Sequence, residues 1–352
     1  MPDSPAINIL TKVFLVSALL FMGAAVLRFG AAFLVPVAEA LLVWFLLNAM
    51  ARGIGRLPTI GAKIPRVLAL GLSALIILVI GYTVLEMTIT TLYDLAPRAA
   101  DIDASLGPLL VSLGERYGFD SEDMLATLMN TVGLEQMFTR IMGAALGFVN
   151  HAGVVLLFVL FLLVDQQFFD AKLRAIVRDE ERRQHIEDLL ERIAGGVQSY
   201  LLIMAFVSGI TAGLSYVIML WVGLEHAAFW ATIIFVLNFI PTIGSILGTA
   251  LPTVFGLLQF QELQPVLILL VSIGAVQFVT GNVLLPRMAG RSLNLSMFVI
   301  MLSLFVWGSI WGITGMLLAV PIMAITTITL SHFDATRPWA LALSQNGELG
   351  AR

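Results

Sequence analysis

Cysteine is absent from this chain of 352 residues. The protein therefore has no disulfide, no thiolate metal site and no cysteine nucleophile. Histidine is nearly as scarce, and its positions show no spacing typical of metal ligands; they are residues 151, 185, 226 and 332. From these two shortages we expect no metal site and no cofactor.

Charged side chains are also rare. They make up 12% of the chain, against roughly 25% in soluble domains. Hydrophobic residues account for 59%, and the mean hydropathy is +0.97. This composition predicts an all-α polytopic protein of the lipid bilayer. The net charge is −4 and no basic tract could follow a phosphate backbone, so a nucleic-acid partner is not expected.

Apolar runs of about 20 residues are long enough to cross a bilayer. We predict six full spans, near residues 9–27, 30–50, 67–91, 141–164, 197–222 and 265–286. The first run is short enough to be a signal peptide. However, its leader contains Asp3 and no clear cleavage site follows, which favours a retained first span.

The basic residues of the short loops predict the orientation of the chain. The loop 51–66 contains four basic and no acidic side chains, so we place it in the cytoplasm. The same topology places the basic loop 287–291 in the cytoplasm as well. The segment 92–140, with eight acidic and three basic side chains, then lies outside. Both termini are expected to be cytoplasmic.

These patterns divide the chain into regions. We predict scaffold spans (1–91), an extracytoplasmic amphipathic segment (92–140), a fourth span (141–164), a cytoplasmic amphipathic helix (165–196), a transport unit (197–330) and a cytoplasmic tail (331–352). The amphipathic helix is inferred from apolar residues at helical spacing.

Two apolar segments have an unusual length. Segment 227–260 has 34 residues and segment 296–330 has 35. One crossing needs about 20 residues, and two crossings with a turn need more than about 40. Each segment also carries helix-breaking residues near its middle, in "NFIPTIGS" (238–245) and "WGSIWGITG" (307–315). A pair of re-entrant hairpins fits both facts, giving eight apolar membrane segments. Two long kinked helices are the alternative.

The predicted topology gives the two hairpins opposite orientations. A shift of 69 residues lays 197–222 over 266–291 and aligns "TALP" (249–252) with "LAVP" (318–321). Inverted repeats with paired broken helices are the architecture of many secondary transporters, whose sites lie where the breaks meet. The sequence therefore indicates a transporter built from two span-plus-hairpin units.

Neutral polar groups lie near these breaks, and they suit a small hydroxyl-rich or mildly anionic solute. The candidate substrate-binding residues are Asn238, Pro241, Thr242, Gly244, Ser245, Gln277, Asn282 and Thr314. The candidate hairpin breaks are Pro252, Gly308, Gly312, Gly315 and Pro321, and Arg287 and Arg291 stand at the cytoplasmic mouth. Alternatively, the Ser and Thr side chains bond to their own backbone, and the amides join helices.

One carboxylate, Glu39, lies near the middle of the second span, after Pro36. An acidic side chain within a membrane is often a proton carrier, which makes Glu39 a candidate coupling residue. A protonated acid bonded to a neighbour and an acid facing a wet cavity are the alternatives.

Four blocks in the last 150 residues resemble the autoinducer-2 exporter family of bacterial inner-membrane transporters, and its quorum-signal exporter branch above all. They are "VQSYLLIMAFVSGI" (197–210), "NFIPTIGSILGTALP" (238–252), "GNVLLPRMAGRSLNLS" (281–296) and "GITGMLLAVPIMAI" (312–325). The matching residues are Asn238, Pro241, Gly244, Ser245, Pro252, Asn282, Pro286, Gly290, Arg291 and Pro321. The N-terminal half matches only in layout, and Gly281 departs from the acidic or polar residue of many relatives.

This resemblance implies export of a small furanose-like signal molecule, driven by an ion gradient. It also implies elevator-type movement in a homo-oligomer, with a pentamer as one possibility. A sodium or potassium/proton antiporter that uses Glu39 is the alternative function. A non-transporting scaffold or sensor built on 165–196 leaves both broken segments unexplained. An enzyme is not expected, because no Ser/His or paired-Asp arrangement lies at membrane depth.

Overall fold

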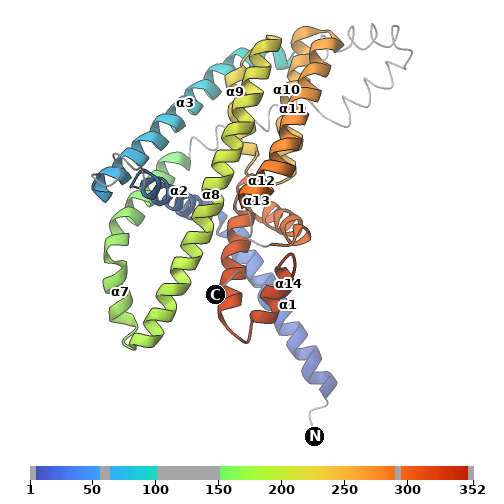
Figure 1. The fold of residues 1–352 in the computed structure, drawn as a ribbon. Helices are drawn as coiled ribbons and strands as arrows, with labels where there is room; N and C mark the ends of the chain where they lie inside the picture. Colours follow the sequence, from blue (N-terminus) through green and yellow to red (C-terminus); the bar gives the residue numbers. More distant parts are fainter. Residues whose placement is uncertain (1–4, 56–63, 101–150, 290–294, 348–352) are drawn as a thin grey trace. The chain divides into compact units, whose positions relative to one another are not determined.

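The computed structural model describes residues 5–55, 64–100, 151–289 and 295–347 (Figure 1). Within these ranges the chain is helical and contains no strand; an isolated antiparallel bridge joins Leu295 to Ser344. Seven helices of the described residues are long and apolar enough to cross a membrane. The prediction of an all-α polytopic membrane protein is therefore confirmed.

The N-terminal helices are α1 (Pro5–Phe29), α2 (Ala31–Gly55) and α3 (Arg66–Ala100). Helices α1 and α2 are separated only by Gly30, where a Cβ atom would lie 2.8 Å from the carbonyl oxygen of Val26. A residue without a side chain is therefore needed at this corner. Helix α3 runs through the predicted third span and includes the first part of segment 92–140, of which residues 101–140 lie outside the described ranges.

The region predicted as one cytoplasmic helix, 165–196, is divided in the structure. Helix 151–165 leads into η3 (Gln166–Phe168) and α7 (Phe169–Ile176). The chain then turns, and α8 (Glu180–Val222) begins after Asp179, whose carboxylate accepts a hydrogen bond from the backbone N–H of Arg182 at 2.8 Å. This contact caps the first turn of α8.

Helix α8 continues without interruption for 43 residues (Figure 1). At 1.5 Å per residue it is about 64 Å long, roughly twice the thickness of a bilayer core. The Gly195–Gly196 pair does not end it. Instead, the absence of a side chain at Gly196 admits Ile328, whose Cδ1 atom lies 3.0 Å from the position of a Cβ atom.

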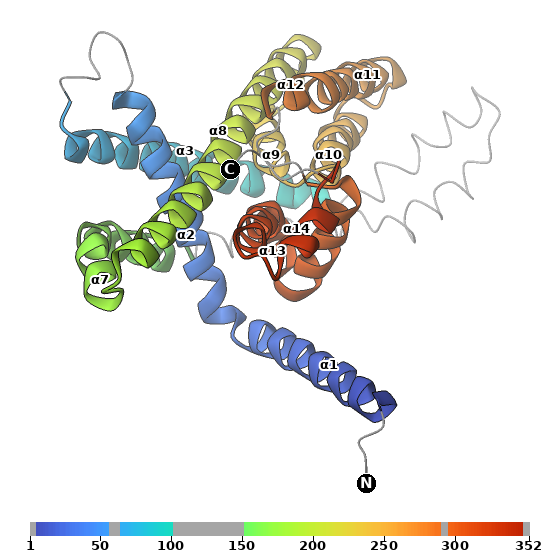
Figure 2. The ribbon, with the colours of Figure 1, turned by 60° about the horizontal axis from the view of Figure 1, so that its bottom comes forward.

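The next elements form a group of helices that lie side by side (Figures 1 and 2). They are α9 (Ala227–Leu237), α10 (Ile243–Phe260), α11 (Leu263–Val279), the π-helical turn η4 (Thr280–Leu284) and α12 (Leu285–Ala289).

The last elements are α13 (Met297–His332) and α14 (Arg337–Leu343), which pack against each other (Figure 2). Helix α13 is not straight, because Gly312 has φ 62° and ψ −140°. The hydroxyl of Ser303 donates a hydrogen bond to the carbonyl of Ala319 at 3.3 Å. In a straight helix these residues would stand about 24 Å apart. The chain therefore reverses at Gly312, and α13 is a pair of antiparallel arms.

The packing divides the chain into two compact units, each built from separate parts of the sequence. The first unit comprises residues 1–45, 154–197 and 293–352, and the second comprises 46–153 and 198–292. The pair of arms in α13 belongs to the first unit, and helices α9 to α12 belong to the second.

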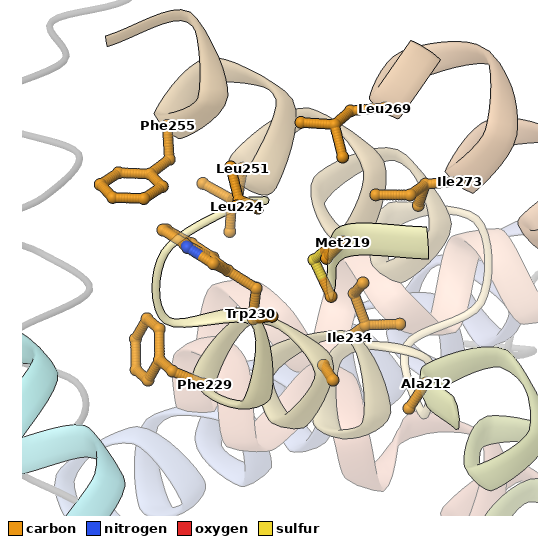
Figure 3. Close-up of a cluster of buried hydrophobic side chains, with 12 residues drawn as sticks. Ala212, Met219, Leu224, Phe229, Trp230, Ile234, Leu251, Phe255, Leu269 and Ile273 are labelled. Atoms are coloured by element: carbon orange, nitrogen blue, oxygen red, sulfur yellow. The ribbon is translucent and has the colours of Figure 1, made fainter. Parts of the chain in front are cut away.

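The second unit has a well-packed apolar centre (Figure 3). The Trp230 indole lies between the rings of Phe229 and Phe255, with centroid distances of 5.1 Å and 5.3 Å. The fully buried side chains of Met219 and Ile234 extend the cluster toward the middle of the unit. Aromatic pairs of this geometry add stabilisation beyond their buried area.

Candidate functional site: two helical hairpins

Helices α9 and α10 form the first hairpin, residues 227–260. A Cβ atom on Gly244 would lie 1.9 Å from the carbonyl oxygen of Leu237, and one on Gly248 would lie 3.5 Å from Cγ1 of Ile234. Residues later in α10 thus face residues earlier in α9, as antiparallel helices require. The chain reverses over 238–242, within the predicted break.

The tip of the first hairpin holds five of the predicted substrate-binding residues. The Asn238 Oδ1 atom is buried and has no hydrogen-bond partner among the described residues. Thr242 is exposed and has φ 65°, a conformation that β-branched residues rarely adopt. Pro241 and Ser245 are half-buried, and Gly244 is buried. The tip therefore combines an unpaired polar atom with a strained backbone, as functional sites often do.

Gln277, on α11, is the second predicted residue with an unpaired polar atom. Its side chain is 5% exposed, and its Nε2 atom has no partner among the described residues. That atom lies 2.8 Å from the position that a Cβ atom on Gly248 would occupy. The amide therefore packs directly against the backbone of α10, and only glycine leaves room for it. Amide orientation follows from the hydrogen-bond network, so either end of the group could face a ligand.

Helix α8 meets the junction of α11 and η4 at two threonines. The hydroxyl oxygens of Thr211 and Thr280 lie 2.9 Å apart, and both residues are buried. Each hydroxyl also lies 2.8 Å from a carbonyl four residues earlier, that of Val207 or Val276. Both pairs are 69 residues apart, which is the shift of the predicted repeat. Contact between equivalent positions is what a pseudo-twofold axis between the two helices produces.

Two serines on α8 belong to the same polar region and were missed by the sequence analysis. Ser208 and Ser215 are fully buried, and their hydroxyls have no partner among the described residues. With Thr211 they occupy positions i, i+3 and i+7, which is one face of a helix. This spacing could have predicted, from the sequence alone, a polar stripe on one face of the helix. An antiparallel register through Thr211 and Thr280 places Ser215 at the level of Gln277.

The arms of α13 form the second hairpin, residues 297–332. A Cβ atom on Gly315 would lie 1.9 Å from the carbonyl oxygen of Trp307, and one on Gly308 would lie 2.8 Å from the Cε atom of Met316. Of the predicted breaks, Gly312 is the point of reversal. Gly308 and Gly315 are instead helical residues that let the arms approach each other closely.

The tip of the second hairpin contacts residues 27–39, which form the end of α1, the turn at Gly30 and the first part of α2; these residues are the α1–α2 corner. The Thr314 hydroxyl donates a hydrogen bond to Oε1 of Glu39 at 3.0 Å. The Trp311 indole N–H donates to the carbonyl of Leu27 at 2.9 Å. The structure thus brings together two predicted residues, Glu39 and Thr314, that are 275 positions apart. A third bond joins the same two regions, from the Arg28 guanidinium to the Ser309 carbonyl at 3.0 Å.

Pro252 and Pro321 do not break their helices, contrary to our expectation. Both are buried inside continuous helix, in α10 and in the second arm of α13. A proline removes one backbone bond, and packed neighbours in a membrane protein compensate for that loss. The breaks fall instead where the backbone takes a positive φ, at Thr242 and Gly312.

Two other predicted residues, Asn282 and Arg287, are exposed. Asn282 is exposed and its amide donates to the carbonyl of Phe278 at 3.0 Å, within the π-helical turn. Such turns are frequent at functional sites. Arg287 is exposed, and Arg291 lies outside the described residues. In the described ranges no three His, Asp or Glu side chains are placed to hold a metal ion.

Comparison with known proteins agrees with this architecture. The AI-2E family transporter profile matches residues 15–335. The chain is 29% identical over 324 residues to the AI-2 transport protein TqsA of Escherichia coli, covering 90% of this chain and 91% of that protein. It is 32% identical over 206 residues to a protein of Borreliella burgdorferi named as a transport protein, covering 58% and 57%. The chain therefore belongs to the AI-2E family of membrane transporters, which are not enzymes.

Proposed function

We propose that this protein is a secondary transporter that exports a small polar metabolite by alternating access, with autoinducer-2 as the substrate to test first. The observation that carries this proposal is the set of buried, unpaired polar atoms on and beside the first hairpin, Asn238 Oδ1 and Gln277 Nε2. A buried polar atom without a partner costs about 1–3 kcal/mol. A solute that bonds to these atoms would recover that free energy.

The residues around these atoms favour a neutral or weakly anionic solute. Between residues 197 and 331 the only charged side chains are Glu225, Glu262, Arg287 and Arg291. The buried polar groups of α8 and α11 are hydroxyls and the two amides of Gln198 and Gln277, which can both donate and accept. A hydroxyl-rich molecule such as a furanose can use both roles. The name of the relative TqsA makes autoinducer-2 the natural candidate.

The movement that we propose is elevator-like. Residues 197–330 would act as the moving transport unit and the N-terminal spans as scaffold, in a homo-oligomer for which a pentamer is the first state to test. The contact between Thr211 and Thr280, at the repeat shift of 69 residues, supports an inverted repeat. In this proposal both hairpins are re-entrant, the protein resides in the bacterial inner membrane, and both termini are cytoplasmic.

A cation/proton antiporter is the second candidate, and one contact favours it. The bond between Thr314 and Glu39 ties the only acidic side chain of α2 to a helix break. Proton exchange driven by sodium or potassium, measured in the unmodified protein and in Glu39→Gln, tests this second function. If the protein is an antiporter, sodium- or potassium-driven proton exchange stops in Glu39→Gln while the protein stays folded and assembled. Unchanged exchange removes Glu39 from the mechanism.

Uptake of labelled autoinducer-2 into proteoliposomes of the purified protein tests the proposal directly, with and without an imposed proton gradient. We expect saturable uptake that responds to the gradient. No uptake, together with dissipation of the gradient by added sodium or potassium, would favour the antiporter.

Single substitutions then locate the solute. We expect Gln277→Ala to raise the KM for uptake by roughly tenfold, the value of one buried hydrogen bond to a ligand. Asn282→Ala should have a smaller effect, because that side chain is exposed and bonded to Phe278. Gln264→Ala, which removes an exposed amide from the same helix, is the matched control. If the double variant Gln277→Ala/Asn282→Ala transports normally and inserts normally, these residues do not bind solute.

A further inference from the structure

Three hydrogen bonds hold the tip of the second hairpin against the corner between α1 and α2. Arg28 donates to the Ser309 carbonyl, Trp311 donates to the Leu27 carbonyl, and Thr314 donates to Glu39. All these residues belong to the first unit. They cluster around the reversal at Gly312, so they fix the tip rather than the arms.

Only one of the three bonds depends on a group that titrates. The guanidinium stays protonated in proteins, and the indole N–H is only a donor. The Thr314 bond instead ends on a carboxyl oxygen. Its strength therefore depends on protonation, since a hydrogen bond to an ionised acceptor is roughly twice as strong as one between neutral groups.

The helices near Glu39 carry the following other charged side chains among the described residues. Among the described residues, α13 carries no acidic or basic side chain before His332, and α1 contributes Arg28 at its end. Helix 151–165, which contacts α2 through the Phe33–Phe158 ring pair, contributes Asp165, and that carboxylate is paired with Lys172. The remaining charged side chain of α2 is Arg52, more than three turns away.

We propose that Glu39 is the proton-binding site of this transporter, and that proton binding there loosens the tip of the second hairpin at the α1–α2 corner. This inference rests on the proposed function. A proton from water adds to the carboxylate, and the resulting neutral acid accepts a weaker bond from Thr314. The acid O–H becomes a new donor. The Arg28 and Trp311 bonds remain, so the tip loosens without detaching from the α1–α2 corner.

The absence of cysteine makes the test direct, because one introduced cysteine carries one label. A nitroxide is attached at Ile313→Cys, an exposed position beside the reversal, in the full-length protein in lipid vesicles. Electron paramagnetic resonance then measures the mobile fraction of the label from alkaline to acidic pH. We expect the ratio of mobile to immobile label to rise roughly fivefold to tenfold on acidification, because the extra strength that the charge gives to one hydrogen bond is lost.

Matched variants assign the change to Glu39. Glu39→Gln keeps an accepting oxygen but cannot ionise, so the label should be equally mobile at every pH. Thr314→Val keeps the shape without the donor and should do the same. Arg28→Ala should raise mobility at all pH values and retain the pH dependence. A label at Phe305→Cys, on the first arm, reports any general change of the protein.

The outcomes separate this inference from the proposed function, because the readout needs no substrate. A label at Ile313→Cys whose mobility does not change with pH would overturn the proton site, even if uptake of autoinducer-2 succeeds. The same holds if Glu39→Gln leaves the pH dependence intact. Conversely, pH-dependent loosening that is lost in Glu39→Gln supports the inference even where autoinducer-2 is not the substrate.

Discussion

The two helical hairpins of this protein reverse the chain in different ways and differ in the contacts beside their reversals. The first uses a turn of several residues with Thr242 at positive φ, and packs in the aromatic cluster around Trp230. The second uses Gly312 alone and is held at its tip by hydrogen bonds. Each turn is followed closely by a glycine, Gly244 or Gly315, in van der Waals contact with the opposite arm.

This difference predicts that the first hairpin is the more rigid of the two. Burial of large side chains is strong and does not depend on pH or on a partner's charge. A few hydrogen bonds at a tip are weaker, and each is worth about 1 kcal/mol net. A hairpin held in the second way can move when one bond changes. We therefore expect the first hairpin to behave as a fixed part of its unit and the second as the adjustable one.

The largest effect should come from the two close-contact glycines. Val in place of Gly244 or Gly315 would put side-chain atoms where the opposite carbonyl lies, since even a Cβ atom would be 1.9 Å from it. We expect either hairpin to open, with a loss of more than about 4 kcal/mol of stability. Size-exclusion chromatography and thermal unfolding in detergent measure it. Gly213→Ala, where a Cβ meets nothing within 4 Å, is the control.

The aromatic cluster should matter next. Phe255→Ala removes a ring that is 3% exposed and contacts Trp230, and should cost about 3–5 kcal/mol. Phe305→Ala, on the second hairpin, removes a ring that is 72% exposed and should change stability by less than about 0.5 kcal/mol. Equal losses in the melting temperature would contradict the view that the buried ring of Phe255, unlike the exposed ring of Phe305, stabilises its hairpin by packing.

Substitutions at the two reversal residues, Thr242 and Gly312, should change stability in opposite directions. Thr242→Gly should raise stability by about 1 kcal/mol, because glycine adopts positive φ without strain. Gly312→Ala should lower stability by about 2 kcal/mol, because φ 62° with ψ −140° is a region open only to glycine. Thermal unfolding of both variants is the measurement. A stabilised Thr242→Gly protein with slower uptake would show that the strain serves transport.

The smallest effect should come from the tip. Trp311→Phe keeps the ring but removes the donor to Leu27, and should cost about 1 kcal/mol. The matched control is Trp307→Phe, because no hydrogen bond of the Trp307 indole is found within the described residues. If both variants unfold at the temperature of the unmodified protein, the tip is not held by this bond.

Much of the fold was predictable because it depends on local composition and length. The break in 227–260 was expected from Pro241 and Gly244, and the structure reverses the chain there. The break in 296–330 was expected from three glycines, of which only Gly312 reverses the chain. The sequence could not tell these glycines apart, because the same residue type serves to reverse the backbone at one position and to let a neighbouring helix approach at another.

The candidate site was predictable only in part. Asn238 and Gln277 were named as amides near the breaks, and each has one buried polar atom without a partner among the described residues. Their state depends on what surrounds them, as the packing of Gln277 against Gly248 shows. Ser208 and Ser215 were overlooked, because a serine within an apolar span also occurs where it bonds to its own backbone.

The sequence by itself determined that this chain is an all-α polytopic membrane protein, and where two of its apolar segments reverse. The reason is that a membrane requires long apolar helices whose backbone groups are hydrogen-bonded internally, and the hydropathy, length and helix-breaking residues of each segment are local properties of the sequence. Only the tertiary structure decided that Thr314 bonds to Glu39, 275 residues away, and that Thr211 meets Thr280. Such contacts depend on how helices pack, and no local pattern in the sequence specifies them.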